Sequence, residues 1–390
     1  MTSILASLAI ALVTIPTLAG PPANLSWDRW KTVPGVFDLG GPMTHGAVVV
    51  AGSAALYLLS LAGDVIPFAG GQGGYHDDAG AEAYLAVSPG LRDSAAGCSF
   101  APDETFVLRL HAPVGITVVD PFGQTSSPFA NIPATGLNGI AFDSEGAFDH
   151  RLLATAPLPG HSAVYAIDCK GSVSLVTSTA PVFEGGLVVA PSTFGRFGGT
   201  LIAPDELSGV IWSIGPNGKA AKLVDSGVPA GGDIGVESVA FVPSGFARGG
   251  NLYFADRGTA GSPHPGTDSL LRLSSAQLVS AGVQEGDLLG ASEGGATMID
   301  VRCNPDCHPM TLIGTPTTAH GEGHLVFTMD QPPSPSPTSS PAAGATAAPT
   351  PTNQASGLGP GVVAGVLLIA LVGAGIGFLA LRRRSPKPPR

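Results

Sequence analysis

A repeated pattern of short apolar strands and turn residues is the feature that most limits the possible fold. From Glu184 to Ser226 the chain reads as four short apolar runs separated by Gly, Pro, Asn and Asp. The runs show no long helical periodicity, and their turn-residue boundaries indicate antiparallel strands. Because the same plan recurs along the chain, we interpret residues 184–226 as one four-stranded blade of a β-propeller.

Each repeat opens with a polar residue, and successive openers stand about 46 to 56 positions apart. The openers are Glu82, Asn138, Glu184, Glu237 and Glu293. With a compressed first repeat before Gly70, they predict a six-bladed β-propeller, whose ring closure protects the short strand edges. We expect the first blade to borrow a strand from Thr32–Leu39 or His324–Met329. A pair of β-sandwiches is the alternative architecture.

Composition agrees with an all-β fold and excludes one class of partner. The 390 residues include 55 Gly and 36 Pro, too many breakers for long helices. The formal net charge is −11, and basic residues cluster only at the extreme C-terminus. Because phosphate binding needs a basic face, nucleic acid is not an expected partner.

Both ends of the sequence carry targeting signals. Residues 1–19 form an apolar segment ending in Thr17-Leu18-Ala19, which predicts a secretory signal peptide. Residues 361–381 are uncharged, and about 21 residues at ~1.5 Å rise match the ~30 Å core of a bilayer. The basic tail, residues 382–390, predicts a cytoplasmic C-terminus, so residues 20–330 are expected to be extracellular.

The segment between domain and membrane is a predicted stalk. Residues 331–360 contain no charge and no aromatic side chain, and are dense in Pro, Ser and Thr. Such a segment cannot bury enough apolar surface to offset its ordering entropy. We expect a disordered stalk that holds the propeller away from a single-pass membrane anchor.

Two strand patterns resemble those of a known group of propellers. GLNGIAFDSEG from Gly136 and NLYFADRG from Asn251 are similar to strands of NHL-repeat and SMP-30/gluconolactonase-like six-bladed propellers. The resemblance covers roughly Thr32 to Asp330. It implies the fold, and a divalent ion held at one mouth of the central channel by acidic residues and an Asn, here Asn138.

The polar openers are the main candidate site. In a propeller each innermost strand begins near one mouth of the channel, so these side chains would converge there. Carboxylate and amide oxygens suit Ca²⁺. The resemblance to the lactonase-like family implies Asn138, Glu184 and Glu237 as its ligands. The alternative is that they cap strand ends or face solvent at the rim.

Two further polar motifs could contribute to the same mouth. In HGEGH, alternation along a strand would place His320, Glu322 and His324 on one face. The two glycines disfavour the helix of a zinc-protease motif. The loop His76-Asp77-Asp78 leads to Glu82 and could line the mouth. A turn or solvated loop is the alternative for both.

The four cysteines predict disulfides in an exported protein. Cys303 and Cys307 enclose only Asn-Pro-Asp, a tight turn that a bond could staple, which leaves Cys98 and Cys169 as a second pair. Four cysteines allow three pairings, and a zinc site at Cys303, Cys307 and His308 is the competing interpretation.

Two functions follow from these features. The first is a cell-surface recognition module, in which the propeller binds an extracellular small molecule, carbohydrate or protein. The second is a membrane-tethered, divalent-metal-dependent hydrolase of the lactonase or esterase type, in which calcium polarises an ester carbonyl. No Ser, His and Asp can be assigned to a catalytic triad by their sequence context, so nucleophilic hydrolysis has no positive support.

Overall fold

The computed structural model describes residues 25–76 and 82–330, which form six four-stranded antiparallel sheets and one small hairpin. From the inside outward, the first blade consists of β2 (Asp38–Gly40), β3 (Val48–Gly52), β4 (Ala55–Leu59) and β5 (Val65–Phe68). The second consists of β6 (Leu85–Val87), β9 (Thr105–Arg109), β10 (Gly115–Val119) and β11 (Ser126–Asn131). Its first connection carries the hairpin of β7 (Arg92–Asp93) and β8 (Cys98–Ser99).

The next two blades are also continuous in sequence. The third consists of β12 (Gly139–Phe142), β13 (Leu152–Leu158), β14 (His161–Ile167) and β15 (Val173–Ala180). The fourth consists of β16 (Val188–Val189), β17 (Leu201–Asp205), β18 (Val210–Ile214) and β19 (Ala220–Asp225). A 3-10 turn, η1 (Gly195–Phe197), connects the first two strands of the fourth blade.

The last two blades are interleaved along the chain. The fifth consists of β20 (Val236–Phe241), β23 (Leu288–Ser292), β24 (Met298–Cys303) and β25 (Cys307–Ile313). The sixth consists of β26 (Gly321–Met329), β21 (Gly250–Asp256), β22 (Ser269–Ser274) and β1 (Asp28–Thr32). The turn η2 (Phe246–Arg248) precedes β21, and the short helix α1 (Ser275–Ser280) leads from β22 back to the fifth blade.

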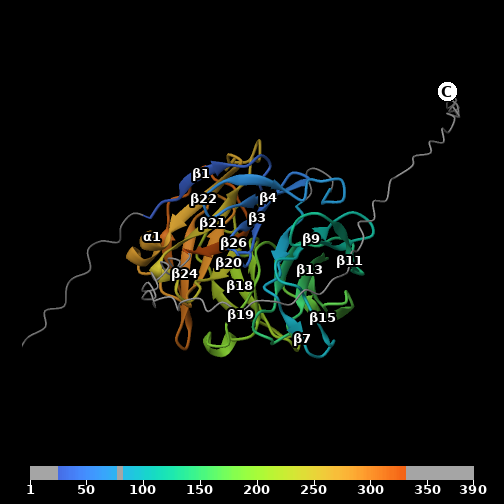
Figure 1. Ribbon diagram of the computed structural model, residues 1–390. Coiled ribbons are helices and arrows are strands. Elements are labelled where there is room, and N and C mark those ends of the chain that lie inside the picture. Colours follow the sequence, from blue (N-terminus) through green and yellow to red (C-terminus); the bar gives the residue numbers. More distant parts are fainter. Residues whose placement is uncertain (1–24, 77–81, 331–390) are drawn as a thin grey trace, which may run out of the picture. The chain divides into compact units, whose positions relative to one another are not determined.

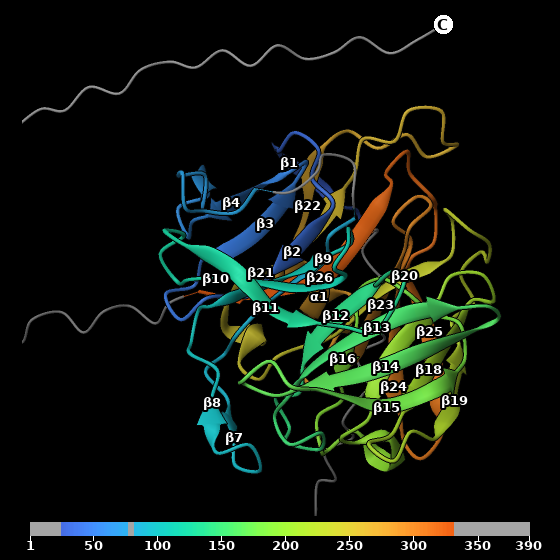
Figure 2. The same cartoon turned by 90° about the vertical axis from the view of Figure 1, so that its right-hand side faces the viewer.

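The six inner strands close a ring. Contacts join β2 to β6, β6 to β12, β12 to β16, β16 to β20, β20 to β26, and β26 to β2. Figures 1 and 2 show the sheets around this centre, with β20 and β26 near the middle of Figure 1 and β1, β11 and β15 toward its edge. The predicted all-β, six-bladed propeller is confirmed.

The predicted division of the chain into blades was right for the first blade and wrong for the last two. The first blade takes its fourth strand, β2, from one of the two predicted segments, because Asp38 and Leu39 lie in Thr32–Leu39; the other segment, His324–Met329, lies in β26, which shares the sixth blade with β1. Openers at Glu237 and Glu293 would place β21 and β22 in one blade with β20, but these strands pair with β26 and β1. A local apolar pattern marks a strand without naming its partner, because pairing depends on backbone hydrogen bonds between distant segments.

The hydrophobic core lies between neighbouring blades. Phe106 of the second blade packs edge-to-face on Phe142 of the third, with ring centroids 5.4 Å apart. Phe100 contacts both rings, and Ile140 and Leu152 complete this cluster. Similar clusters fill the other wedges, so each blade buries apolar side chains on both faces. This packing fixes the radial arrangement of the inner strands.

Two disulfides were expected and both are present. Cys303 bonds to Cys307 across the β24–β25 turn, and Cys98 of the β7–β8 hairpin bonds to Cys169 in the third blade. The competing zinc site at Cys303, Cys307 and His308 is wrong, because neither thiol is free.

Several predicted segments lie outside the described residues. These are the signal peptide (1–19), the stalk (331–360), the transmembrane segment (361–381), the tail (382–390), and Asp77 and Asp78 of the Gly-rich loop. Among residues 25–76 and 82–330, no helix combines the length and hydrophobicity needed to cross a bilayer.

Candidate functional site

At one mouth of the central channel, residues at the start of the inner strands lie beside residues at the end of the second strands. Each inner strand begins at this mouth, and the antiparallel second strand of each blade ends there. Glu82 and Glu184 precede inner strands, and Glu237 lies within β20. Glu206, Arg257 and Glu293 directly follow the second strands β17, β21 and β23. The mouth therefore carries more charged residues than the repeat openers alone.

Three carboxyl groups converge at the centre of this mouth. One oxygen from each of Glu206, Glu237 and Glu293 lies within 4.8 Å of the other two. The three residues are 8%, 2% and 7% exposed. A second triad, Glu293, His320 and Glu322, meets the same distance limit. Glu293 belongs to both triads, so the two form one cluster, which we call the acidic mouth.

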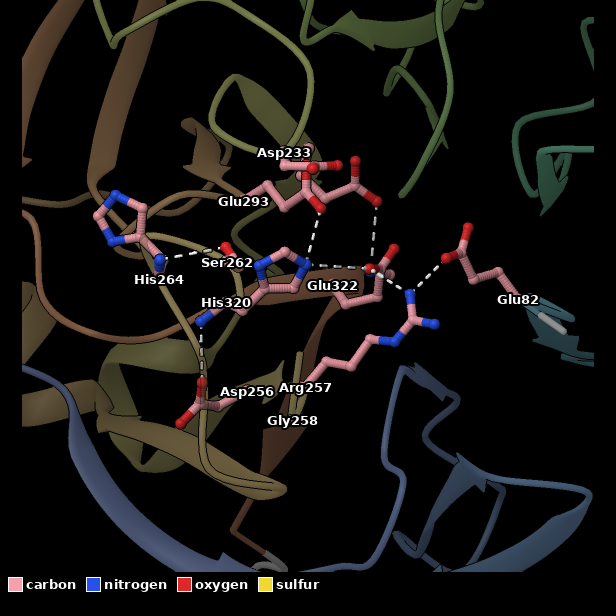
Figure 3. Close-up of polar contacts among 12 residues, drawn as sticks. Glu82, Asp233, Asp256, Arg257, Gly258, Ser262, His264, Glu293, His320 and Glu322 are labelled. Carbon is pink, nitrogen blue, oxygen red and sulfur yellow. Dashed lines mark hydrogen bonds and ion pairs between the residues drawn. The ribbon is translucent and has the colours of Figure 1, made fainter. Parts of the chain in front are cut away.

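His320 is the imidazole at the centre of the acidic mouth. Its Nε2 lies 2.9 Å from Oε1 of Glu293 and 4.0 Å from Oε2 of Glu322. Dashed lines mark these contacts in Figure 3. Its backbone N–H donates to Oδ1 of Asp256 at 2.9 Å. The other ring nitrogen, Nδ1, is buried without a hydrogen-bond partner among the described residues.

Arg257 connects the buried cluster to solvent. Its Nη1 lies 3.2 Å from Oε2 of Glu322 and also contacts Oε1 of Glu82 (Figure 3). The side chain of Glu82 is 49% exposed, whereas that of Glu322 is 4% exposed. The guanidinium therefore bridges one buried and one solvent-exposed carboxylate at the edge of the mouth.

Tyr84, which precedes β6 of the second blade, contacts two carboxyl groups of the acidic mouth. Its hydroxyl donates to Oε1 of Glu322 at 2.6 Å and lies 3.3 Å from Oε1 of Glu237. The backbone N–H of Gly323 also approaches Oε1 of Glu237, at 3.4 Å. Burial, followed by the charges of Glu237 and Glu322, raises the pKa of Tyr84 well above its usual value. The hydroxyl therefore remains a donor to these carboxyl groups.

Burial and like charge hold several carboxyl groups in the protonated form. Burial, together with hydrogen bonds shared with Glu293 and Glu184, raises the pKa of Glu206 to about 10. Burial and the nearby charges of Glu82 and Glu293 raise the pKa of Glu322 to about 8. Burial and neighbouring carboxylates likewise raise the pKa of Glu237. At neutral pH these groups retain protons that a bound cation could replace.

The pKa values of Glu293 and His320 shift in opposite directions. Burial opposes ionisation of Glu293, but hydrogen bonds from His320 and Glu206 outweigh it and lower the pKa of Glu293. Burial also disfavours the charged imidazole, but contact with Glu293 raises the pKa of His320. The pair is thus the ion pair at the centre of the acidic mouth.

The predicted site residues separate into those in the acidic mouth and those beside it. Glu237, Glu293, His320 and Glu322 lie within it, and Glu82 reaches it through Arg257. Glu184 lies close enough to Glu206 to contribute to its raised pKa. Glu293 was expected to open an inner strand, which was wrong; it follows β23, the second strand of the fifth blade.

Asn138 and His324 have protein partners instead. The Asn138 side chain accepts from Thr155 Oγ1 at 3.0 Å and donates to the Phe183 carbonyl at 2.9 Å. His324 lies beyond Gly323 in β26, where its ring nitrogens contact Oδ1 of Asp38 and the Ile140 carbonyl, each at 2.9 Å. The structure therefore does not place His324 in the acidic mouth.

Sequence reasoning missed Tyr84, Glu206 and Arg257. All three are charged or polar residues beside a strand end, but they are neither repeat openers nor part of the HGEGH motif or the His76 loop. The signal that could have found Glu206 and Arg257 is their position directly after the second strand of a hairpin. In an antiparallel pair that position lies opposite the start of the inner strand.

The donor set of the acidic mouth fits a hard divalent cation. Glu206, Glu237 and Glu293 offer carboxylate oxygens only, the ligand type that Ca²⁺ prefers. The expected Ca²⁺ ligand Glu237 is part of this set, and Glu184 adjoins it. The second triad includes an imidazole nitrogen, which suits transition metals better. The all-oxygen triad is therefore the better candidate for calcium.

Comparison with known proteins adds fold-level similarities. No family model and no curated protein matches this sequence. A chain of a nidogen/laminin complex is 10% identical with a TM-score of 0.44, covering 76% of this chain and 86% of that one. Virginiamycin B lyase from Staphylococcus aureus is 11% identical with a TM-score of 0.42, covering 78% and 96%.

A third similar structure is regucalcin from Agrobacterium tumefaciens, described as a calcium-binding protein. It is 11% identical with a TM-score of 0.42, covering 72% of this chain and 75% of that one. Such distant likenesses say nothing about ligands or activity. The six-bladed ring implied by the NHL and SMP-30 resemblance is confirmed by the sheet topology of this chain.

Proposed function

We propose that this protein is a surface-anchored recognition module that binds its extracellular ligand through a calcium ion at the acidic mouth. Glu206, Glu237 and Glu293 would hold the ion. A carbohydrate hydroxyl, or a carboxylate of a protein partner, would complete its shell of about six to eight oxygens. The predicted signal peptide, stalk and membrane segment supply the surface location in this proposal.

The observation that carries the proposal is the concentration of buried carboxyl groups. Glu206, Glu237, Glu293 and Glu322 are all less than 9% exposed, and the cations that contact them in the described range are Arg257 and His320. Taking a carboxylate out of water costs several kcal/mol unless a partner compensates it. Without an ion the raised pKa values of Glu206, Glu237 and Glu322 keep protons on these groups, and a divalent cation would replace those protons.

The surroundings of the acidic mouth also suit ligand recognition. Arg257 and Glu82 are 24% and 49% exposed at its edge, and they hold each other in place. A guanidinium and a carboxylate at an entrance can donate to and accept from sugar hydroxyls or peptide groups. A ligand reaching the ion would therefore meet a preordered polar rim.

The direct test is calcium binding by the full-length protein, measured by isothermal titration calorimetry after chelator treatment. We expect binding of Ca²⁺ in preference to Mg²⁺, which demands a smaller, stricter octahedral shell. Glu293→Gln should weaken binding at least tenfold, whereas Glu104→Gln, outside the acidic mouth, should leave it unchanged. Absence of calcium binding by the wild-type protein would remove the proposal.

A calcium-dependent hydrolase is the second candidate, favoured by proton-transfer groups in the acidic mouth. Glu322, with its pKa raised to about 8 by burial and by Glu82 and Glu293, lies beside His320 and Tyr84. A group that titrates near neutral pH is suited to general acid or base catalysis. Turnover of a lactone and ester panel that requires calcium, and is lost in Glu322→Gln, would favour this function over recognition alone.

A further inference from the structure

The opposite mouth of the channel has a different chemistry. The inner strands share one direction, as the parallel bridge between Gly186 and Ser238 indicates, so their last residues gather at this second mouth. A cavity of about 770 Å³ opens there, and a second of about 290 Å³ shares its wall and reaches His324 inside the channel. We call the two together the apolar funnel.

The wall of the apolar funnel is hydrophobic and firmly packed. It includes Val188, Phe241, Leu325 and Phe327, from the inner strands of three blades. Phe241 packs edge-to-face on Phe194 at 4.7 Å, and Phe327 packs on Phe246 at 4.9 Å. Because these rings are held by neighbouring aromatic side chains, the funnel is preformed. The volume of its larger cavity, about 770 Å³, lies in the range of small-molecule sites, roughly 300–1,000 Å³.

The charged groups that line the larger cavity of the apolar funnel are carboxylates. Glu145 and Glu285 line this 770 Å³ cavity, and no Lys, Arg or His in the described range does. Arg248 lies near Glu285 outside the lining, and His324, which lines the smaller cavity, is paired with Asp38. Glu145 accepts from the Ser192 N–H at 2.9 Å, and Glu285 accepts from the Ala247 N–H at 3.3 Å. Both side chains are exposed, so they stand where the funnel meets solvent.

We propose that the apolar funnel is a second binding site, whose ligand is a small hydrophobic cation. The apolar body of such a molecule would displace water from Val188, Phe241 and Leu325, and its positive charge would remain near Glu145 and Glu285. Complementary charge at the rim, with burial of the apolar part, distinguishes this ligand from a neutral or anionic one. The site is separate from the acidic mouth and does not depend on calcium.

Tetraphenylphosphonium and tetraphenylborate are matched probes, because they share size and shape and differ in the sign of their charge. With the full-length protein, calorimetry should show the cation binding at least tenfold more tightly than the anion. The double variant Glu145→Gln/Glu285→Gln should reduce this preference to about threefold or less, since exposed charge pairs each contribute modestly. Asp64→Asn, an exposed carboxylate outside the funnel, should preserve it.

Val188→Phe tests the location, because it fills the funnel with an apolar side chain. It should weaken binding of tetraphenylphosphonium at least tenfold, while Glu237→Gln in the acidic mouth should leave it unchanged. Equal binding of the two ions would overturn the charge assignment. No binding of the cation, or binding unaffected by Val188→Phe in a variant with an unchanged melting temperature, would overturn the site.

Discussion

Oδ1 of Asp38 lies 2.9 Å from Nδ1 of His324, joining residues 286 positions apart at the centre of the ring. Asp38 also accepts from the backbone N–H groups of Leu85 and His324, at 2.6 and 2.7 Å. The other ring nitrogen of His324 reaches the Ile140 carbonyl. These contacts connect the first, second, third and sixth blades, so one carboxylate and one imidazole tie the ring together across the channel.

Removing the carboxylate should destabilise the ring strongly. Asp38→Ala leaves the His324 imidazole and three backbone N–H groups without their buried acceptor. Breaking a buried pair in this way costs about 3–5 kcal/mol. Denaturant unfolding measures this loss, with the exposed Asp64→Asn as a control of the same charge change. A loss below about 1 kcal/mol would contradict the structural role of Asp38.

Without a divalent cation, stability should decrease as pH rises. Burial and like charge raise the pKa of Glu322 to about 8 and of Glu206 to about 10, from a usual value of 4.5. Between about pH 4.5 and these values the folded chain binds more protons than the unfolded chain, so the free energy of unfolding falls with pH. Proximity to Asp38, which outweighs burial, raises the pKa of His324, and this acts in the same direction above its usual value of 6.5.

Melting temperatures measured from about pH 5 to 9 in chelator would show this decline. Calcium should reduce it, because the ion replaces the retained protons and binds only the folded state. At a concentration a hundredfold above its dissociation constant, calcium should stabilise the protein by about 2.7 kcal/mol. A melting temperature that rises with pH in chelator would contradict the raised carboxyl pKa values.

Glu237→Gln should have opposite effects with and without calcium. In chelator it removes a carboxyl group whose ionised form is disfavoured, while its amide oxygen can still accept from Tyr84 and Gly323. We expect unchanged or higher stability in chelator, by up to about 1 kcal/mol, and loss of the stabilisation by calcium. Thermal melting in both conditions tests this. Strong destabilisation in chelator would show that the charge of Glu237 is needed without any ion.

The two disulfides should contribute unequally to stability. Cys98 and Cys169 are 71 positions apart, whereas Cys303 and Cys307 are 4 apart. Loop-closure entropy predicts about 4 kcal/mol for the long loop and about 2 kcal/mol for the short one. Unfolding of the paired serine variants, Cys98→Ser/Cys169→Ser against Cys303→Ser/Cys307→Ser, measures the difference. Equal losses would mean that strain or local packing outweighs chain entropy.

Many of the strands and turns were predictable from local sequence. The Pro216-Asn217-Gly218 turn between β18 and β19 was predictable because Gly218 adopts a φ of +76°, which other residues rarely accept. The count of six blades followed from the five polar openers and the compressed first repeat before Gly70. The interleaving of the fifth and sixth blades was not predictable, because β21 resembles any second strand and its partner, β26, begins 65 residues after β21 ends (321 minus 256).

The candidate site was predictable in part. Glu237, Glu293, His320 and Glu322 were found from blade openers and the HGEGH motif, although Glu293 reaches the mouth from an unexpected strand. Glu206, Arg257 and Tyr84 were missed, because nothing in a single strand shows which side chains of other blades lie opposite.

The sequence by itself determined where the strands and turns fall, how many blades they make, and which cysteines form the short loop, because these depend on neighbouring residues. Only the tertiary structure decided which strands share a sheet, that His324 binds Asp38 instead of a ligand, and that one mouth is acidic while the other is apolar. The reason is that burial and charge proximity are properties of the closed ring, in which residues hundreds of positions apart become neighbours.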